Sequence, residues 1–176
     1  MKFFLAAVFL TLCAATANAN FIYNVDRTLG GFTLAGTIAT NVNNGVLATG
    51  NIIMPDTSLT LSGDNFSFGV VNVFIQGSAV SATPEELLYD FTTGAENTFL
   101  LFGTGGNLYS WCLETKGCSD GAADPSEFID NGTNVAFQQD RTGEVVVFAT
   151  VVPVPAAVWL FASGLLGLVG IARRKR

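Results

Sequence analysis

The sequence predicts an all-β body, an antiparallel β-sandwich or jelly-roll-like domain, between an N-terminal signal peptide and a C-terminal transmembrane helix. Short apolar runs alternate with a period of two and are separated by turn residues, which is typical of half-buried strands. The 15 phenylalanines, many beside β-branched residues, supply a bulky apolar interior. Helix signals are few in the body. We therefore expect about seven to nine strands in one domain over residues 20–150.

The first 19 residues, MKFFLAAVFLTLCAATANA, have the pattern of a secretory signal peptide. Lys2 precedes an apolar run over residues 3–12, and Ala17 and Ala19 form a small-x-small cleavage site. We expect cleavage after Ala19. The alternative is an uncleaved anchor, which the short apolar run disfavours because a membrane span needs about 20 residues.

The clearest strand signals of the body come from three segments. GFTLAGTIAT at 31–40 alternates between two faces, 41–45 forms a turn, and 46–54 is the expected return strand. The segment 58–76 holds two further runs around Gly63-Asp64-Asn65. In the same way, residues 140–143 join a run at 134–139 to another at 144–151.

One segment of the body carries a helix-start signal. Thr83, Pro84 and Glu86 supply an N-cap, a proline at the first helical position and a glutamate at the third. Residues 87–89 either extend this helix by a turn or already belong to a strand. A short linker over residues 150–155 then closes the body.

The charge of the body differs from that of the whole chain. Residues 20–150 contain all 14 acidic residues and only three basic ones, Arg27, Lys116 and Arg141, a net charge of −11. Such a surface repels phosphate backbones, so nucleic acid is not an expected partner. The charge suits an extracytoplasmic protein that attracts divalent cations.

The two cysteines of the body, Cys112 and Cys118, predict a local disulfide. An exported chain with two cysteines six positions apart forms such a bond readily, and Cys13 leaves with the signal peptide. A redox or zinc role is disfavoured because the chain has neither a CxxC motif nor a histidine.

The residue types of the body disfavour catalysis. The chain has no histidine, which excludes Ser-His-Asp and Cys-His mechanisms. We therefore expect no enzymatic activity and no cofactor. A glycosidase built on two carboxylates is a weaker alternative, because acidic residues on a small exported body usually serve solvation.

Two binding hypotheses arise from side-chain chemistry. An acidic stretch can hold calcium through oxygen ligands, although its spacing differs from an EF-hand and a solvated loop is the alternative. Its candidate ligands are Asp120, Asp124, Glu127 and Asp130. Separately, Phe102, Tyr109 and Trp111 either line a sugar-binding face or belong to the core, which is the more common place for such aromatics.

The C-terminal segment predicts a membrane-spanning helix over residues 156–172. These residues include neither charge nor proline and span roughly 25 Å as a helix, with Trp159 near the interface. Four basic residues, 173–176, follow. The positive-inside rule places them in the cytoplasm and the body outside.

This tail resembles a PEP-CTERM sorting signal, in the variant where Val-Pro-x-Pro-Ala-Ala replaces Pro-Glu-Pro. The residues that carry the resemblance are Val152, Pro153, Pro155, Ala156, Ala157, Trp159, Arg173 and Arg174. Val154 stands where the family usually has glutamate. The resemblance implies a Gram-negative source, processing by an exosortase, and association with exopolysaccharide or biofilm. A plain anchor that is never cut is the alternative.

The body is also similar, more loosely, to other exported PEP-CTERM proteins, through GTIATNVNNGVLATGNIIMPDTSLTLSG at 36–63. Those bodies carry no assigned chemistry. We therefore expect an exported, membrane-tethered and then sorted surface or matrix protein without catalytic activity. The alternative is a carbohydrate- or calcium-dependent binding module displayed at the cell surface.

Overall fold

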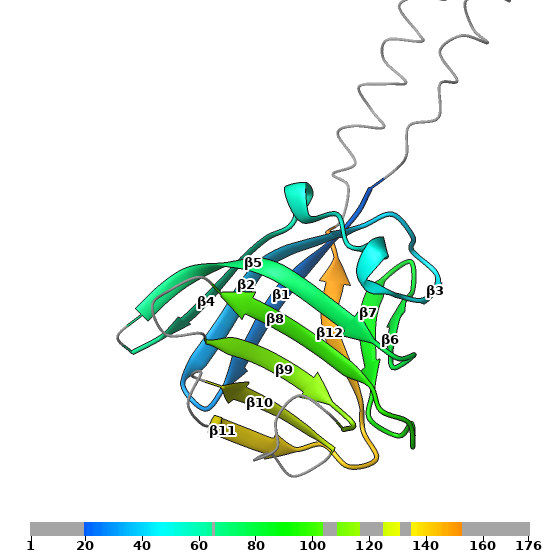
Figure 1. The fold of residues 1–176 in the computed structure, drawn as a ribbon. Coiled ribbons are helices and arrows are strands. Elements are labelled where there is room, and N and C mark those ends of the chain that lie inside the picture. Colours follow the sequence, from blue (N-terminus) through cyan, green and yellow to red (C-terminus); the bar gives the residue numbers. More distant parts are fainter. Residues whose placement is uncertain (1–19, 65, 104–108, 117–124, 131–134, 153–176) are drawn as a thin grey trace, which may run out of the picture.

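The described part of the chain forms one curled antiparallel β-sheet (Figure 1). Its 12 strands follow the order β11-β10-β9-β8-β5-β4-β2-β1-β12-β7-β6-β3. The all-β prediction is confirmed at this level, while the expected seven to nine strands were too few. The computed structural model describes residues 20–64, 66–103, 109–116, 125–130 and 135–152.

Two very short 3-10 helices, η1 (Thr49–Asn51) and η2 (Met54–Asp56), interrupt the strands. The strands are β1 (Phe21–Leu29), β2 (Phe32–Thr40), β3 (Gly45–Val46), β4 (Ser58–Gly63), β5 (Phe66–Gln76), β6 (Val80–Ala82), β7 (Glu86–Asp90), β8 (Thr98–Gly103), β9 (Ser110–Glu114), β10 (Ser126–Asp130), β11 (Val135–Asp140) and β12 (Val145–Val151).

The first hairpin joins β1 and β2 over their whole lengths, from Phe21 opposite Thr40 to Leu29 opposite Phe32. Its two-residue turn consists of Gly30 and Gly31, with φ of +56° and +87°. Positive φ at both central positions is what a tight hairpin turn requires, and glycine adopts it without steric cost. The predicted strand at 31–40 is confirmed as β2, whereas β1 was not predicted.

Strand β5 connects the two halves of the sheet. Residues 66–69 pair with β4, and from Val70 onward the strand pairs with β8 instead. The register shifts between Val70 and Asn72, a β-bulge of the kind that bends a strand. The two runs predicted around Gly63-Asp64-Asn65 are confirmed as β4 and β5, and Asn65 itself lies outside the described residues.

The return strand expected at 46–54 is wrong. Gly45–Val46 pairs with β6, and Ile52 forms only an isolated bridge with Thr40 of β2. The two strands that flank β2 are β1 and β4. The chain then turns through η1 and η2. The Asn51 side chain accepts a hydrogen bond from the Ala48 backbone N–H at 2.8 Å, and Pro55 lies in η2. These local turn-forming contacts compete with continued strand pairing.

The helix start expected at residues 83–86 is also wrong, although its capping contacts form. The Thr83 hydroxyl accepts hydrogen bonds from the backbone N–H groups of Glu86 at 2.9 Å and Glu85 at 3.3 Å. The chain nevertheless continues as β7, in which Leu87 and Tyr89 are buried at alternate positions. The period of two therefore determined the structure, and the strand alternative was correct.

The runs on either side of residues 140–143 are strands, as predicted, but they do not pair with each other. Strand β11 pairs with β10 at one edge of the sheet, and β12 lies between β1 and β7. The turn at 140–143 therefore carries the chain from one half of the sheet to the other.

Contacts between distant strands show that the sheet curls on itself. Phe99 in β8 meets Phe148 in β12 edge to face, with ring centroids 4.8 Å apart. Phe137 in β11 lies over the first hairpin turn, because a Cβ atom on Gly30 would fall 2.2 Å from its ring. Side chains from both halves thus share one buried apolar core.

The chain enters and leaves the body at one end, and the β1–β2 hairpin turn lies at the other. At the terminal end, where β1 starts and β12 stops, Tyr23 pairs with Val151 and the Val152 N–H donates to the Ile22 carbonyl at 2.9 Å. At the hairpin end, the β1–β2 turn lies beside the end of β4, because Thr33 pairs with Ser62. Nine residues of β1 separate the two ends by roughly 30 Å.

The predicted targeting segments lie outside the described residues. These are the signal peptide with Ala17 and Ala19, and the tail from Pro153 onward, with Pro155, Ala156, Ala157, Trp159, Arg173 and Arg174. Across the part of the chain that the structure describes, no helix combines the length and apolarity that crossing a membrane requires.

Candidate functional site

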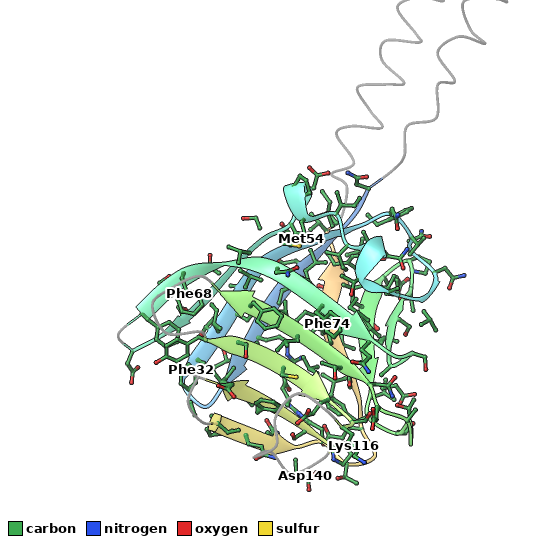
Figure 2. The ribbon with its side chains drawn as sticks, viewed as in Figure 1. Phe32, Met54, Phe68, Phe74, Lys116 and Asp140 are labelled. Carbon is green, nitrogen blue, oxygen red and sulfur yellow. The ribbon has the colours of Figure 1, made fainter. Side chains whose placement is uncertain are left out.

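Four aromatic side chains gather at the hairpin end, and we call them the aromatic cluster: Phe32, Phe66, Phe68 and Tyr109. Phe66 is central, with ring centroids 4.1 Å from Tyr109, 5.2 Å from Phe68 and 5.8 Å from Phe32. Phe32 and Phe68 are labelled on this side of the molecule in Figure 2. All four rings are half-buried and pack against the core.

Two glycines make room for the aromatic cluster. A Cβ atom on Gly103 would lie 1.7 Å from the Phe68 ring, and one on Gly63 would lie 2.7 Å from the Phe66 ring. Neither distance is sterically allowed, so the rings occupy space that any other residue would fill. Gly103 ends β8, and its N–H donates to the Tyr109 carbonyl at 3.1 Å, which places Tyr109 beside the cluster.

The aromatic cluster borders a hollow of about 190 Å³ that opens to solvent. Phe32, Asp64, Phe66 and Tyr109 line it, and Asp64 is exposed in the β4–β5 turn. An apolar wall with one polar group beside it is the usual composition of a small-ligand site. The hollow therefore offers an apolar aromatic surface and one carboxylate that accepts hydrogen bonds.

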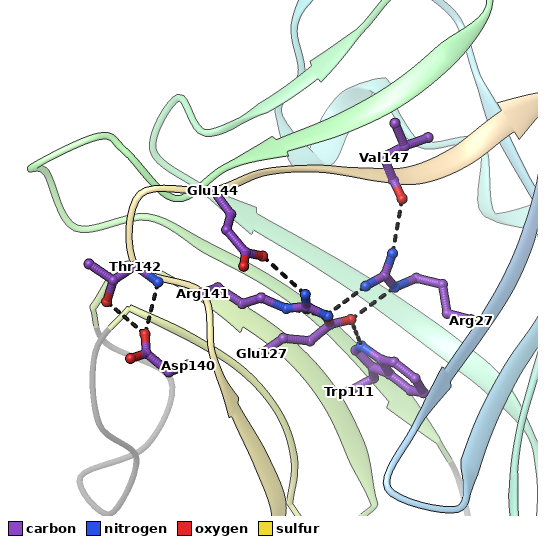
Figure 3. Close-up of polar contacts among 8 residues, drawn as sticks. All are labelled: Arg27, Trp111, Glu127, Asp140, Arg141, Thr142, Glu144 and Val147. Atoms are coloured by element: carbon purple, nitrogen blue, oxygen red, sulfur yellow. Dashed lines mark hydrogen bonds and ion pairs between the residues drawn. The ribbon is translucent and has the colours of Figure 1, made fainter.

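A second cluster, the Glu127 cluster, surrounds a buried carboxylate (Figure 3). Arg27 donates to both oxygens of Glu127, from Nε at 2.9 Å and from Nη2 at 2.6 Å. Arg141 donates to Oε2 from Nη2 at 2.7 Å and from Nε at 3.1 Å. The Trp111 indole N–H donates to Oε1 at 2.9 Å. Glu127 itself is completely buried.

The arginines of the Glu127 cluster have further partners that close the network. Arg27 donates to the Val147 carbonyl at 2.9 Å, and its guanidinium lies 5.5 Å from the centre of the Phe148 ring. Arg141 donates to Glu144 at 3.0 Å. The network joins β1, β9, β10 and β12. Its ion pairs and hydrogen bonds therefore hold together strands that are far apart in the sheet order, which is a structural role.

A third polar cluster, around Asn97, is likewise closed. Its Oδ1 accepts from the backbone N–H groups of Ser78 at 2.6 Å and Ala79 at 3.1 Å, and its Nδ2 donates to Thr115 Oγ1 at 3.2 Å. The Tyr89 hydroxyl donates to the Asn97 carbonyl at 2.8 Å. Burial raises the pKa of Tyr89 well above its usual range, so this phenol stays neutral and structural.

The structure gives one calcium candidate another role. The Glu127 carboxylate accepts from two guanidinium groups and an indole, so its oxygens are occupied. Asp130 ends β10, while Asp120 and Asp124 lie outside the described residues. Among the residues with described positions, no group of three or more acidic or cysteine side chains could hold a metal ion. Calcium binding by the acidic stretch stays a prediction.

The three aromatics proposed for a sugar-binding face do not form one. Trp111 is completely buried, which agrees with the core alternative. Phe102 follows the buried Leu101 in β8 and therefore faces the opposite side of the sheet. Tyr109 belongs to the aromatic cluster. Sequence reasoning missed Phe32, Phe66, Phe68 and Asp64, although aromatics flanking a Gly-Asp turn were a visible signal.

The predicted disulfide also stays a prediction. Cys112 is completely buried in β9, and Cys118 lies outside the described residues. No protein-family model, curated protein or solved structure matches the chain. The functional argument below therefore depends on the residues, their geometry and the resemblance of the tail.

Proposed function

We propose that this chain is an exported surface or extracellular-matrix protein, tethered to the membrane by its tail until an exosortase processes it. One structural observation supports this: the start of β1 and the end of β12 pair at the same end of the body. Both predicted targeting segments therefore attach at one end. The hairpin end, with the aromatic cluster, is left free to face away from the membrane.

The tail supplies the rest of the proposal. Its resemblance to a PEP-CTERM signal supports a Gram-negative source, export across the inner membrane, a precursor with a cytoplasmic C-terminus, and an exopolysaccharide or biofilm setting. Val152 is 40% exposed and still bonded to Ile22, so the segment that resembles the sorting motif begins directly at the folded body. The expected partners are the exosortase and the membrane.

We also propose that the curled sheet works as a β-sandwich. The contacts of Arg27 in β1 with Glu127 in β10, and of Phe99 in β8 with Phe148 in β12, support this arrangement. These strands are far apart in the sheet order, so their side chains meet only when the two halves face each other. A sandwich with closed internal contacts is a stable scaffold for display.

The proposal includes no catalytic activity. It is supported by the absence of histidine from the sequence and by the engagement of the Glu127 carboxylate in ion pairs. Carbohydrate binding is the second candidate function, and the hollow beside the aromatic cluster favours it. Calcium-dependent binding has less support, because Glu127 is already occupied by arginines.

Intact-mass analysis of the protein recovered from its native host tests the sorting proposal. We expect a mass that starts after Ala19 and ends near residues 152–155, because the exosortase removes the helix. A mass that retains Arg176 contradicts sorting and supports a plain anchor.

A matched variant makes this experiment more specific. Replacing Pro153 and Pro155 together with alanine removes the extended motif but keeps the apolar helix and the basic end. We expect the double variant to be exported and to retain Arg176. If it is cut like the natural chain, the Val-Pro-x-Pro motif does not direct processing.

A further inference from the structure

We propose that the hollow lined by Phe32, Asp64, Phe66 and Tyr109 binds a hexose ring of a neutral polysaccharide chain. This inference rests on the display role proposed above and adds a binding site and a ligand class to it. The site lies at the hairpin end and includes Tyr109, one of the three aromatics that the sequence suggested for sugar binding. Trp111, another of the three, takes no part because it is buried.

The lining of the hollow matches the two-sided chemistry of a sugar. A pyranose ring has an apolar C–H face and a rim of hydroxyl donors. Phe66 and Tyr109 stack on each other, with ring centroids 4.1 Å apart and planes at 22°, so the apolar wall for the C–H face is the outer side of this stack. The Asp64 carboxylate accepts hydrogen bonds from the hydroxyl groups on the rim of the sugar. A wholly apolar ligand fits less well, because it would desolvate that carboxylate without compensation.

The size of the hollow also fits one sugar ring. Its volume is about 190 Å³. An apolar cavity of about 150 Å³ in a protein core admits benzene, which is another six-membered ring. Because the hollow opens to solvent, the rest of a polymer chain can continue across the surface on either side.

The charges nearby favour a neutral polymer over an anionic one. Asp64 is the one charged residue among the described residues that line the hollow. Two of the three basic side chains of the body, Arg27 and Arg141, are engaged by the buried Glu127 and cannot turn outward. The remaining net charge of the body repels uronate-rich chains.

The rings are held in place for binding before a ligand arrives. Gly63 and Gly103 provide the space beneath Phe66 and Phe68, and the close ring contacts restrict their rotation. Little side-chain entropy is therefore lost when a sugar stacks on the wall. A loosely arranged set of exposed aromatics would lack this advantage.

Native gels that contain soluble polysaccharide test the proposal on the full chain, kept in a detergent without sugar headgroups. The neutral probes are hydroxyethylcellulose, galactomannan and dextran, and the anionic probe is alginate. We expect at least one neutral polymer to retard the protein and alginate to have no effect. Absence of retardation by all three neutral polymers, or retardation by alginate alone, overturns the proposal.

Variants separate stacking from general surface adhesion. Tyr109→Ala is expected to weaken retardation about tenfold, and Tyr109→Phe is expected to retain it because the ring remains. Phe74→Ala is the matched control, since Phe74 is an aromatic residue in β5 that is 41% exposed and faces away from the core. An equal loss in Phe74→Ala and Tyr109→Ala overturns the site.

Asp64→Ala keeps the test decisive if Tyr109→Ala fails to fold. Asp64 is exposed in a turn, so this variant is expected to fold and to bind about tenfold more weakly. Unchanged binding in folded Asp64→Ala contradicts the proposal, whether or not Tyr109→Ala folds. Because the gels use purified precursor, a failure of sorting leaves this result unaffected, and a failure of binding leaves the mass analysis unaffected.

Discussion

The Glu127 cluster and the aromatic cluster both join strands far apart in the sequence. They differ in whether their groups have all their partners inside the protein or remain open to solvent. The Glu127 carboxylate is fully buried and accepts from Arg27, Arg141 and Trp111. The aromatic cluster is half-buried and borders an open hollow. A charge without water must find all its partners inside the protein, whereas exposed ring faces remain available to a ligand.

This difference separates residues that serve the fold from residues that remain available for the proposed binding. Charged and tryptophan residues attract functional hypotheses when only the sequence is known. Here the buried Trp111 and the two arginines serve the fold, while simpler phenylalanines around a Gly-Asp turn form the more promising site. Whether a polar or aromatic group already has all its partners inside the protein is therefore a better guide to a binding role than residue type.

The largest expected effect comes from breaking the Glu127 cluster. Glu127→Gln removes the buried carboxylate that Arg27 and Arg141 share and leaves Arg141 paired with Glu144 alone. Loss of one partner of a buried ion pair typically costs about 3–5 kcal/mol. We expect the free energy of unfolding in urea, followed by circular dichroism, to fall by about 3 kcal/mol. The molecules that remain folded should still bind neutral polysaccharide.

Glu144→Gln is the matched control for this experiment. Glu144 pairs with the same Arg141, but its side chain is 48% exposed, so the expected loss is below about 1 kcal/mol. If both variants lose the same stability, the Glu127 cluster is not the main tie between the halves of the sheet. If Glu127→Gln abolishes binding without a change in stability, the division between the two clusters is wrong.

An intermediate effect is expected from Gly103→Ala. Its Cβ atom would lie 1.7 Å from the Phe68 ring, so the aromatic cluster must rearrange. Forcing extra atoms into a packed site typically costs about 1–3 kcal/mol, and we expect a fall in that range together with weaker retardation by polysaccharide.

Gly94→Ala is the control for this glycine. No atom lies within 4 Å of a Cβ placed at Gly94, so the substitution is expected to leave stability within about 0.5 kcal/mol and binding unchanged. Normal binding by Gly103→Ala would show that the hollow does not depend on the rings as they are packed here.

Local signals in the sequence predicted part of this structure. Alternation identified β2, β4, β5 and β12, because side chains with a period of two face alternate sides of a strand whatever it pairs with. The same rule placed Leu87 and Tyr89 correctly in the strand alternative. Around Thr83, the capping contacts were predicted correctly but did not start a helix, because burial of the strand face outweighed them.

The two clusters were harder to predict, because their residues meet only through strand pairing. Arg27 and Glu127 are 100 positions apart, and no local pattern relates them. Tyr109 reaches Phe66 only because β5 pairs first with β4 and then with β8 across a bulge. The glycines that seat the rings resembled ordinary turn residues in the sequence. Predicting such contacts requires the strand topology, and neither the hydrophobic periodicity nor the composition of the sequence determines that topology.

The smallest expected effect concerns a turn that belongs to neither cluster. The Asp140 carboxylate accepts from the Thr142 hydroxyl at 2.7 Å and from the Thr142 N–H at 2.8 Å, and these bonds lower its pKa below the ordinary 3.8. Because the folded-state pKa is depressed, its contribution to stability is present above the unfolded pKa and is lost as the pH falls through the folded value.

Thr142→Ala removes the hydroxyl donor and keeps the N–H donor. We expect the pKa of Asp140, measured by NMR titration of its carboxyl carbon, to rise part of the way toward its ordinary value. Thr142→Ser retains the hydroxyl and should leave the pKa low. Polysaccharide binding should stay unchanged in both variants, because this turn lies outside the hollow. An unchanged pKa in Thr142→Ala would mean that the N–H bond alone holds the carboxylate.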